Sequence, residues 1–291
     1  MIYSYMDRDD FLSIDAIRFG WNGLWNNLRF FLILTIIMAV LYNLPSLIAA
    51  YVFNLEVKNG AISSQDFLMH LLLAVVSIIV YLTVELGLLR IALNFRDNNT
   101  AEFKDLFRGY PLLMKYLVGT MIFALIVILP FFFLSLAGAL LLDQGTSKAI
   151  VFIIAFLILL AAAVYLFLKY QFYDYLIVDR GLGPIEALQQ SGRLTEGILK
   201  NLLIFWLEIG LAIGVAIAMV SIFIEIPVTI VLMLISKDLA PMAGNLLSSA
   251  INLLIMVPIT KLATADIYRR LERRSAAKAL SDNSQMKGSG S

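Results

Sequence analysis

Apolar residues along this chain gather into six long runs that are separated by short polar pieces. The runs cover roughly residues 30–53, 67–94, 116–142, 149–178, 202–235 and 246–267. A helix needs about 20 residues to cross roughly 30 Å of hydrocarbon, and each run is long enough. Backbone groups in lipid must be hydrogen-bonded internally, and the alternating ten-residue strands of a barrel do not occur. The pattern therefore predicts an all-α fold, a polytopic membrane protein with six transmembrane helices.

The polar pieces before the first, third and fifth runs are amphipathic. Apolar or small residues recur there at helical spacing: Ile14, Ile17, Trp21, Leu24, Trp25 and Leu28, then Phe103, Leu106, Phe107, Tyr110 and Met114, then Ala187, Ser191, Leu194 and Ile198. An amphipathic segment that leads into a span suits a helix lying at the level of the lipid headgroups. We expect three such helices on one side of the membrane.

The same three runs each carry a proline in their later half, at Pro45, Pro130 and Pro227. The unit of amphipathic helix, proline-bearing span, turn and returning span thus occurs three times, which predicts a threefold repeat of parallel helical hairpins. Coincidence is the alternative, because prolines are common in membrane helices.

Positive charge alternates along the chain and predicts the orientation of the spans. Counting each Lys and Arg with the nearest connecting or terminal piece gives 3, 1, 5, 1, 4, 1 and 7. Cationic pieces stay on the cytoplasmic side. The alternation predicts cytoplasmic amphipathic helices and two cytoplasmic termini.

Composition narrows the class of protein further. Of the 291 residues, 61% are hydrophobic and 15% are charged, the net charge is +1, and there is no cysteine and one histidine. This excludes disulfides and metal sites built from Cys or several His, and no charge excess points to nucleic acid. We expect one transmembrane domain over residues 1–274. Residues 275–291 are expected to form a flexible tail, whose last four residues, GSGS, resemble an added linker and carry no functional argument.

Four ionisable residues are the candidate site, as an intramembrane polar cluster. Glu85, Lys169 and Glu208 each lie about eight to ten residues, or roughly 12–15 Å, from the cytoplasmic end of their run. Lys261 lies nearer the surface and would extend the cluster. Charges in hydrocarbon cost about 2.5–3.5 kcal/mol each and normally face the protein interior. The cluster is either a polar pathway or headgroup site, or an ion-pair network that fixes helix register.

Small residues in the fifth run, Gly210 and Gly214, are spaced for close helix packing. They would serve packing within the chain or association with a second copy. No nucleophile elbow, phosphate loop or dinucleotide fingerprint occurs in the sequence, so we assign no catalytic residue and expect no cofactor.

The stretch YLFLKYQFYDYLIVDRGLGPIEALQQSGRLTEGILKNLLIFWL, from Tyr165, resembles the YciC-like family of bacterial inner-membrane proteins. It also resembles the related group named for glycerophosphoryl diester phosphodiesterase membrane domains. The matching positions are Val178, Asp179, Gly183, Ala187, Ser191, Leu194, Thr195 and Gly197. The resemblance implies a multi-pass protein of the bacterial inner membrane. It carries over no catalytic residue.

These observations favour a non-enzymatic inner-membrane protein with a structural, envelope-maintenance or partner-binding role. The alternative is a transporter or lipid-handling protein that uses the polar layer in the cytoplasmic half of the membrane. An enzyme is the third alternative. The expected partners are the lipid bilayer, a bound phospholipid and a second copy of the chain.

Overall fold

The computed structural model describes residues 13–48, 64–141, 146–235 and 239–288. Of these residues, 92% are helical and none forms a strand. Six helical stretches among them are long and apolar enough to cross a membrane, and they coincide with the six apolar runs of the sequence. The predicted all-α fold with six membrane-spanning helices is confirmed.

The chain divides into two compact units, which we describe separately. In the described part of the chain, unit 1 contains residues 111–205 and 267–288, and unit 2 contains residues 13–110 and 206–266. Helices α9 (Leu199–Val220) and α12 (Val257–Gly288) each belong partly to both units. The described residues of the 1–274 region, which is expected to be one transmembrane domain, fall into both units.

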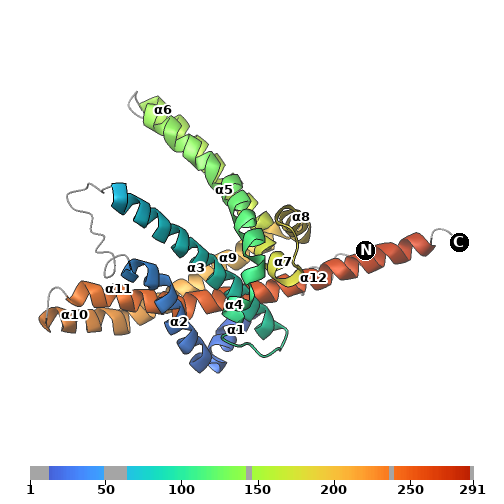
Figure 1. Ribbon diagram of the computed structural model, residues 1–291. Coiled ribbons are helices and arrows are strands. Elements are labelled where there is room, and N and C mark those ends of the chain that lie inside the picture. The colour runs from blue at the N-terminus through green and yellow to red at the C-terminus, as the bar shows by residue number, and fades with distance from the viewer. Residues whose placement is uncertain (1–12, 49–63, 142–145, 236–238, 289–291) are drawn as a thin grey trace. The chain divides into compact units, whose positions relative to one another are not determined.

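Unit 1 centres on a helical hairpin of α5 (Leu113–Leu141) and α6 (Thr146–Tyr170), which run side by side in Figure 1. Two short helices follow, α7 (Tyr173–Arg180) and α8 (Pro184–Leu194), and α8 packs against α5, α6 and α7. The chain reverses between them because Gly181 ends α7 in the left-handed conformation at φ 65°. Pro184 then opens α8 in its first turn, where its missing N–H costs nothing.

Unit 2 holds α1 (Ser13–Asn26), α2 (Leu28–Leu47), α3 (Ser64–Arg96) and α4 (Asp105–Arg108). Helix α2 packs along α3, and the single turn of α4 packs on the end of α3. A 3₁₀ turn, η2 (Tyr110–Leu112), connects α4 to α5. Unit 2 also holds the greater parts of the last two spans.

Each of these last two spans contains one wide helical turn directly before a proline. The π-helical turns η4 (Ser221–Glu225) and η5 (Asn252–Met256) precede Pro227 and Pro258. A proline ring clashes with the carbonyl one turn earlier in an α-helix, and a wider turn relieves that clash. After these wide turns and before them, the two spans continue as α10 (Ile226–Ile235) and α11 (Leu239–Ile251), which lie side by side as a helical hairpin in Figure 1.

Helices α1, α4 and α8, which we call the entry helices, each pack through a glycine on a returning span. A Cβ on Gly20 of α1 would lie 2.6 Å from the Ile259 carbonyl oxygen of α12. A Cβ on Gly87 of α3 would overlap the backbone of Leu106 in α4. In unit 1, a Cβ on Gly192 of α8 would lie 3.4 Å from Cε of Lys169 in α6. Close backbone contact at a glycine therefore occurs for α1 and α4, whereas α8 makes an ordinary side-chain contact there.

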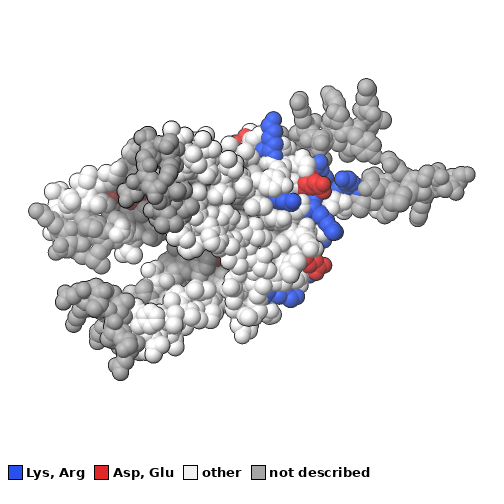
Figure 2. Space-filling view, turned by 90° about the horizontal axis from the view of Figure 1, so that it is seen from above, with Lys and Arg blue, Asp and Glu red and all other residues white. Residues whose placement is uncertain are grey.

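The spans carry apolar side chains on their outer surfaces. Leu211, Phe223 and Leu234 are 71%, 72% and 84% exposed. Most described atoms on the face drawn in Figure 2 belong to residues other than Lys, Arg, Asp and Glu. A soluble protein rarely exposes apolar surface on this scale, so this surface fits contact with lipid.

Helix α12 differs from the sequence expectation at its end, because it continues as a helix to Gly288. A flexible tail was expected from Ser275. The segment from Ser275 contains Ala276, Ala277, Ala279 and Leu280, and Ala and Leu are the strongest helix formers. Once a helix is nucleated by a span, such residues extend it at little cost.

The glycine contact between α3 and α4 predicts a large effect of a small substitution. Gly87→Ala should destabilise the protein by about 1–3 kcal/mol, because the added methyl group meets backbone that cannot move aside. Gly210→Ala is the matched control: its Cβ would meet nothing within 4 Å, and alanine favours a helix by roughly 0.5–1 kcal/mol. Chemical unfolding in mixed micelles measures both. Equal stabilities of the two variants would contradict this packing.

Candidate functional site

Lys169 occupies the last turn of α6, at the wall of a pocket in unit 1. Its ammonium group lies 5.7 Å from the centre of the Tyr165 ring and 5.6 Å from that of Tyr170. Both distances suit cation–π attraction. The side chain is half-buried. Within the described part of the chain it forms no ion pair.

The backbone that carries Lys169 is held by two hydroxyl groups, from Ser191 in α8 and from Thr195 directly after it. Ser191 donates a hydrogen bond of 3.1 Å to the Lys169 carbonyl, and Thr195 donates one of 3.0 Å to the same oxygen. Ser191 also accepts a 3.1 Å bond from the N–H of Phe172. These bonds satisfy backbone groups that are freed where α6 ends and α7 begins. Both hydroxyl residues are fully buried, so α8 is fixed across the break between α6 and α7.

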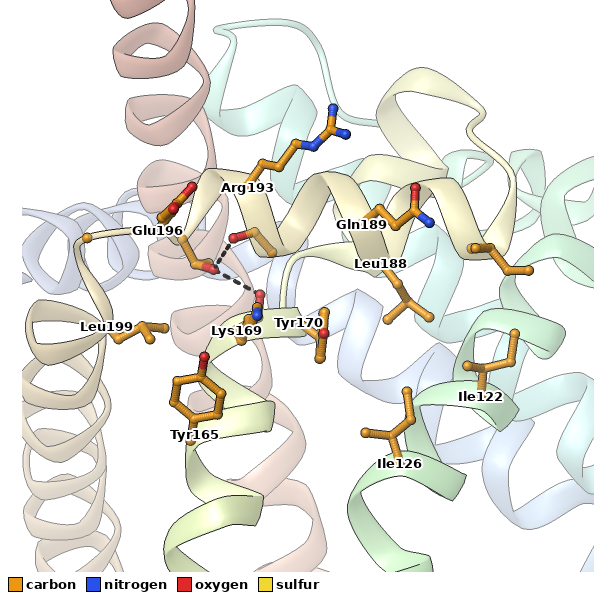
Figure 3. Close-up of a pocket in the computed structure, with 14 residues that line it drawn as sticks. Ile122, Ile126, Tyr165, Lys169, Tyr170, Leu188, Gln189, Arg193, Glu196 and Leu199 are labelled. Carbon is orange, nitrogen blue, oxygen red and sulfur yellow. Dashed lines mark hydrogen bonds between the residues drawn. The ribbon is translucent and has the colours of Figure 1, made fainter.

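The pocket itself has a volume of about 600 Å³ and lies between α5, α6, α8 and the start of α9. Figure 3 shows Ile122 and Ile126 of α5 facing Leu188 across one part of it, and Lys169 and Tyr165 in another. Its polar and charged side chains are those of Tyr165, Lys169, Tyr170, Gln189, Arg193, Thr195 and Glu196. The pocket therefore joins an apolar part to a polar part that contains the Lys169 ammonium, while Figure 3 shows Arg193 on the opposite side of α8 from Leu188. Such a lining suits an amphiphilic ligand.

Glu85 and Lys261 form an ion pair in unit 2. The Lys261 ammonium donates to a Glu85 carboxylate oxygen over 2.5 Å, and both side chains are largely buried. The rings of Tyr42 in α2 and Tyr81 in α3 lie 5.7 Å apart in the same unit. The attraction offsets the cost of holding both charges in an apolar span.

Glu208, in α9, accepts a hydrogen bond from the hydroxyl of Ser13 at the start of α1, also in unit 2. The structure thus joins Glu85 to Lys261 and gives Glu208 a separate partner. Lys169 belongs to unit 1, where its neighbours are aromatic. The four-residue cluster spans the two units, and its existence as one layer stays a prediction.

Three of the ionisable residues lie next to a contact between an entry helix and a returning span. Glu85 precedes Leu86, whose Cβ would be 2.8 Å from a Cβ on Gly109 after α4. Lys261 precedes Leu262, whose Cδ1 would be 2.9 Å from a Cβ on Gly23 of α1. Lys169 lies one position later in this comparison, because it meets Gly192 of α8 itself. Each of these returning spans therefore carries an ionisable residue close to an entry helix.

Sequence analysis missed a second charged network, in unit 1. Arg269 donates two hydrogen bonds of 2.8 Å to the two Asp179 oxygens, and Glu272 accepts from Arg269 and Arg180. The Tyr268 hydroxyl donates to Asp179 at 3.0 Å. This network ties α7 to α12. Its partners lie about 90 residues apart in the sequence, so no local pattern marks them.

Sequence analysis also missed Glu225, in the wide turn η4. Its carboxylate accepts a 2.7 Å hydrogen bond from Ser221, four residues earlier. An acid within the fifth apolar run was a visible signal, since ionisable residues are rare in membrane spans.

Metal chemistry finds no support in the described residues, where no group of three or more His, Asp or Glu could hold an ion. Comparison with known proteins adds no identity: no protein-family model, no curated protein and no solved structure matches this chain.

The hydroxyl bonds from α8 predict a specific loss of stability. Ser191→Ala should destabilise the protein by about 1–3 kcal/mol, because it leaves the buried Phe172 N–H without its acceptor. Ser135→Ala in α5 is the control, since that exposed hydroxyl bonds only the carbonyl of Phe132 in its own helix and should change stability by about 0.5 kcal/mol or less. Chemical unfolding in mixed micelles compares the two, and a Ser191→Ala variant as stable as the control would contradict the assignment.

Proposed function

We propose that this chain is a multi-pass membrane protein that works by binding rather than by catalysis, and that it handles lipid through the pocket of unit 1. One observation carries the proposal: the pocket combines apolar walls with a cationic, hydrogen-bonding part at the end of a membrane span. A phospholipid has the same two parts in the same order. The surrounding spans expose apolar side chains, so a lipid would reach the pocket without leaving the membrane.

We further propose that the protein lies in a bacterial inner membrane with both termini in the cytoplasm. The alternation of Lys and Arg along the chain supports this orientation, and the resemblance to the YciC-like family supports the compartment. In this orientation the entry helices and the Lys169 pocket lie at the cytoplasmic face.

A structural or partner-binding role is the second candidate, and the ion pairs favour it. Glu85 with Lys261, and Asp179 with Arg269, are satisfied within the protein, so these charges are available to fix helix positions. Gly210 and Gly214 leave open space where a Cβ would stand. That open space suits a second copy of the chain better than packing within it. Association through these two glycines remains a prediction.

The orientation predicts the location of the C-terminal end of α12. A reporter that is active only in the cytoplasm should be active when it is fused after Leu280. The same reporter inserted within residues 54–66, between the first two spans, should be inactive and serves as the control. A periplasmic signal from the fusion after Leu280 would overturn the orientation.

The lipid-handling proposal predicts the effect of filling the pocket. Ile126→Trp places a larger side chain on the apolar wall of the pocket. It should weaken the affinity for phospholipid by about tenfold or more, which corresponds to a loss of at least about 1.4 kcal/mol of binding free energy. Native mass spectrometry of the full chain, released from detergent, counts the bound lipids.

The control is Ile128→Trp, on the same helix at a residue that is 61% exposed and does not line the pocket. It should bind lipid like the unsubstituted protein. If Ile126→Trp also binds lipid normally, the pocket is not the lipid site, and the structural or partner-binding role becomes the better account.

A further inference from the structure

Of the three ionisable residues that lie close to an entry helix, Lys169 is the one with no ion-pair partner among the described residues. The other two, Glu85 and Lys261, pair with each other. A charge at the end of an apolar span is stabilised by a counter-charge or by water. The contacts of the Lys169 ammonium are the faces of two tyrosine rings, which attract a cation but do not neutralise it.

The backbone that carries this ammonium group is held in place before any ligand arrives. Ser191 and Thr195 hold the Lys169 carbonyl, and the rings of Tyr165 and Tyr170 flank the side chain. The side chains of Lys169 and Tyr170 also pack beside Gly192. A Cβ on Gly192 would lie 3.4 Å from an atom of each side chain. A cation held in this way binds an anion without first losing much conformational freedom.

The rest of the polar part offers hydrogen-bonding groups. Besides Lys169, the charged residues of the lining are Arg193 and Glu196, and Figure 3 shows Arg193 on the opposite side of α8 from Leu188. Gln189 adds amide hydrogen-bond donors. Gly197 and Leu199 also line the pocket, so the N-terminal turn of α9 borders it, and the first N–H groups of a helix lack acceptors within the helix.

The apolar part limits the kind of anion. Ile122, Ile126 and Leu188 form a wall that a small soluble anion would leave uncovered. Glycerol and the upper parts of acyl chains would cover it, and a volume of about 600 Å³ accommodates a headgroup with these parts.

We propose that this pocket binds the phosphate group of an anionic glycerophospholipid, with the Lys169 ammonium as its counter-ion. The inference rests on the proposed lipid-handling function and deepens it, because it names the class of lipid and the residue that recognises it. The Lys169 side of the pocket takes the headgroup, and the α5 side takes the glycerol and the first acyl carbons.

The test compares lipids that differ only in their headgroups. Dioleoyl phosphatidylglycerol should bind the full chain about tenfold more tightly than dioleoylglycerol, which lacks the phosphate, because one charge-assisted hydrogen bond supports a factor of this size. Dioleoyl phosphatidylcholine, which has the phosphate but no net charge, should fall between them. Native mass spectrometry or thermal stabilisation in detergent gives the ranking on the unsubstituted protein, so this part needs no variant.

Variants then assign the preference to one residue. Lys169→Met should bring phosphatidylglycerol binding down to that of dioleoylglycerol, and Lys169→Arg should keep much of the difference. Lys115→Met is the matched control, because it removes the same charge from unit 1 at a side chain that already donates to the Gly181 carbonyl at 2.6 Å. It should leave the ranking unchanged.

The outcomes separate this inference from the function on which it rests. Equal binding of all three lipids, or a preference that survives Lys169→Met, overturns phosphate recognition while lipid binding lost in Ile126→Trp still supports the lipid-handling role. Lipid binding that persists in Ile126→Trp overturns both. Inorganic phosphate that stabilises the protein as well as phosphatidylglycerol does would make a soluble phosphate compound the ligand and overturn the assignment to lipid.

Discussion

The cost of holding charge inside apolar helices is the constraint on which the rest of this structure depends. Hydrocarbon offers no counter-ion and no hydrogen bond, so each ionisable residue of a span needs a partner from the protein. Glu85 finds Lys261, and Glu208 finds the Ser13 hydroxyl. At the ends of the spans, Arg96 pairs with the buried Asp266. These contacts join helices that are distant in sequence and fix their register. Lys169 obeys the same constraint with aromatic rings and a pocket instead of an acid.

Glycine contacts set where the entry helices lie, and this placement decides which charges meet. In unit 2 the contacts bring backbone against backbone: Gly20 meets the Ile259 carbonyl, and Gly87 meets Leu106. Short segments such as α4, with four residues, could not persist as isolated helices in water or at a membrane surface. They are stable because the glycines let them pack tightly on a long span, and because buried Asp105 accepts hydrogen bonds from Asn94, Arg108 and the Glu102 N–H.

The six spans could be predicted from the sequence, whereas the contacts of the candidate site could be predicted only in part. The reason is physical. Hydropathy is a local property, so runs of apolar residues predict six helices without any knowledge of packing. Residue counting also predicts a similar depth for Glu85 and Lys169, and that likeness stays a prediction. Partner choice was not visible, since it depends on helix rotation. The pairing of Asp179 with Arg269 is therefore seen only in the fold. The end of α12 carries two opposing local signals. Its polar composition indicates a flexible tail, whereas its alanines favour the helix that the structure has.

The three entry helices contact their neighbouring spans in different ways, and the pocket lies beside α8. Entry helices α1 and α4 touch their returning spans through backbone, which leaves no room between them. Helix α8 touches α6 through the side chains of Lys169 and Tyr170, and a Cβ on Gly192 would be at ordinary contact distance from them. Its attachment comes instead from the hydroxyls of Ser191 and Thr195, which reach across to the Lys169 carbonyl. The pocket beside α8 is bordered by Lys169, which has no acid paired to it in the described chain. This coincidence of room and charge favours a bound anion there.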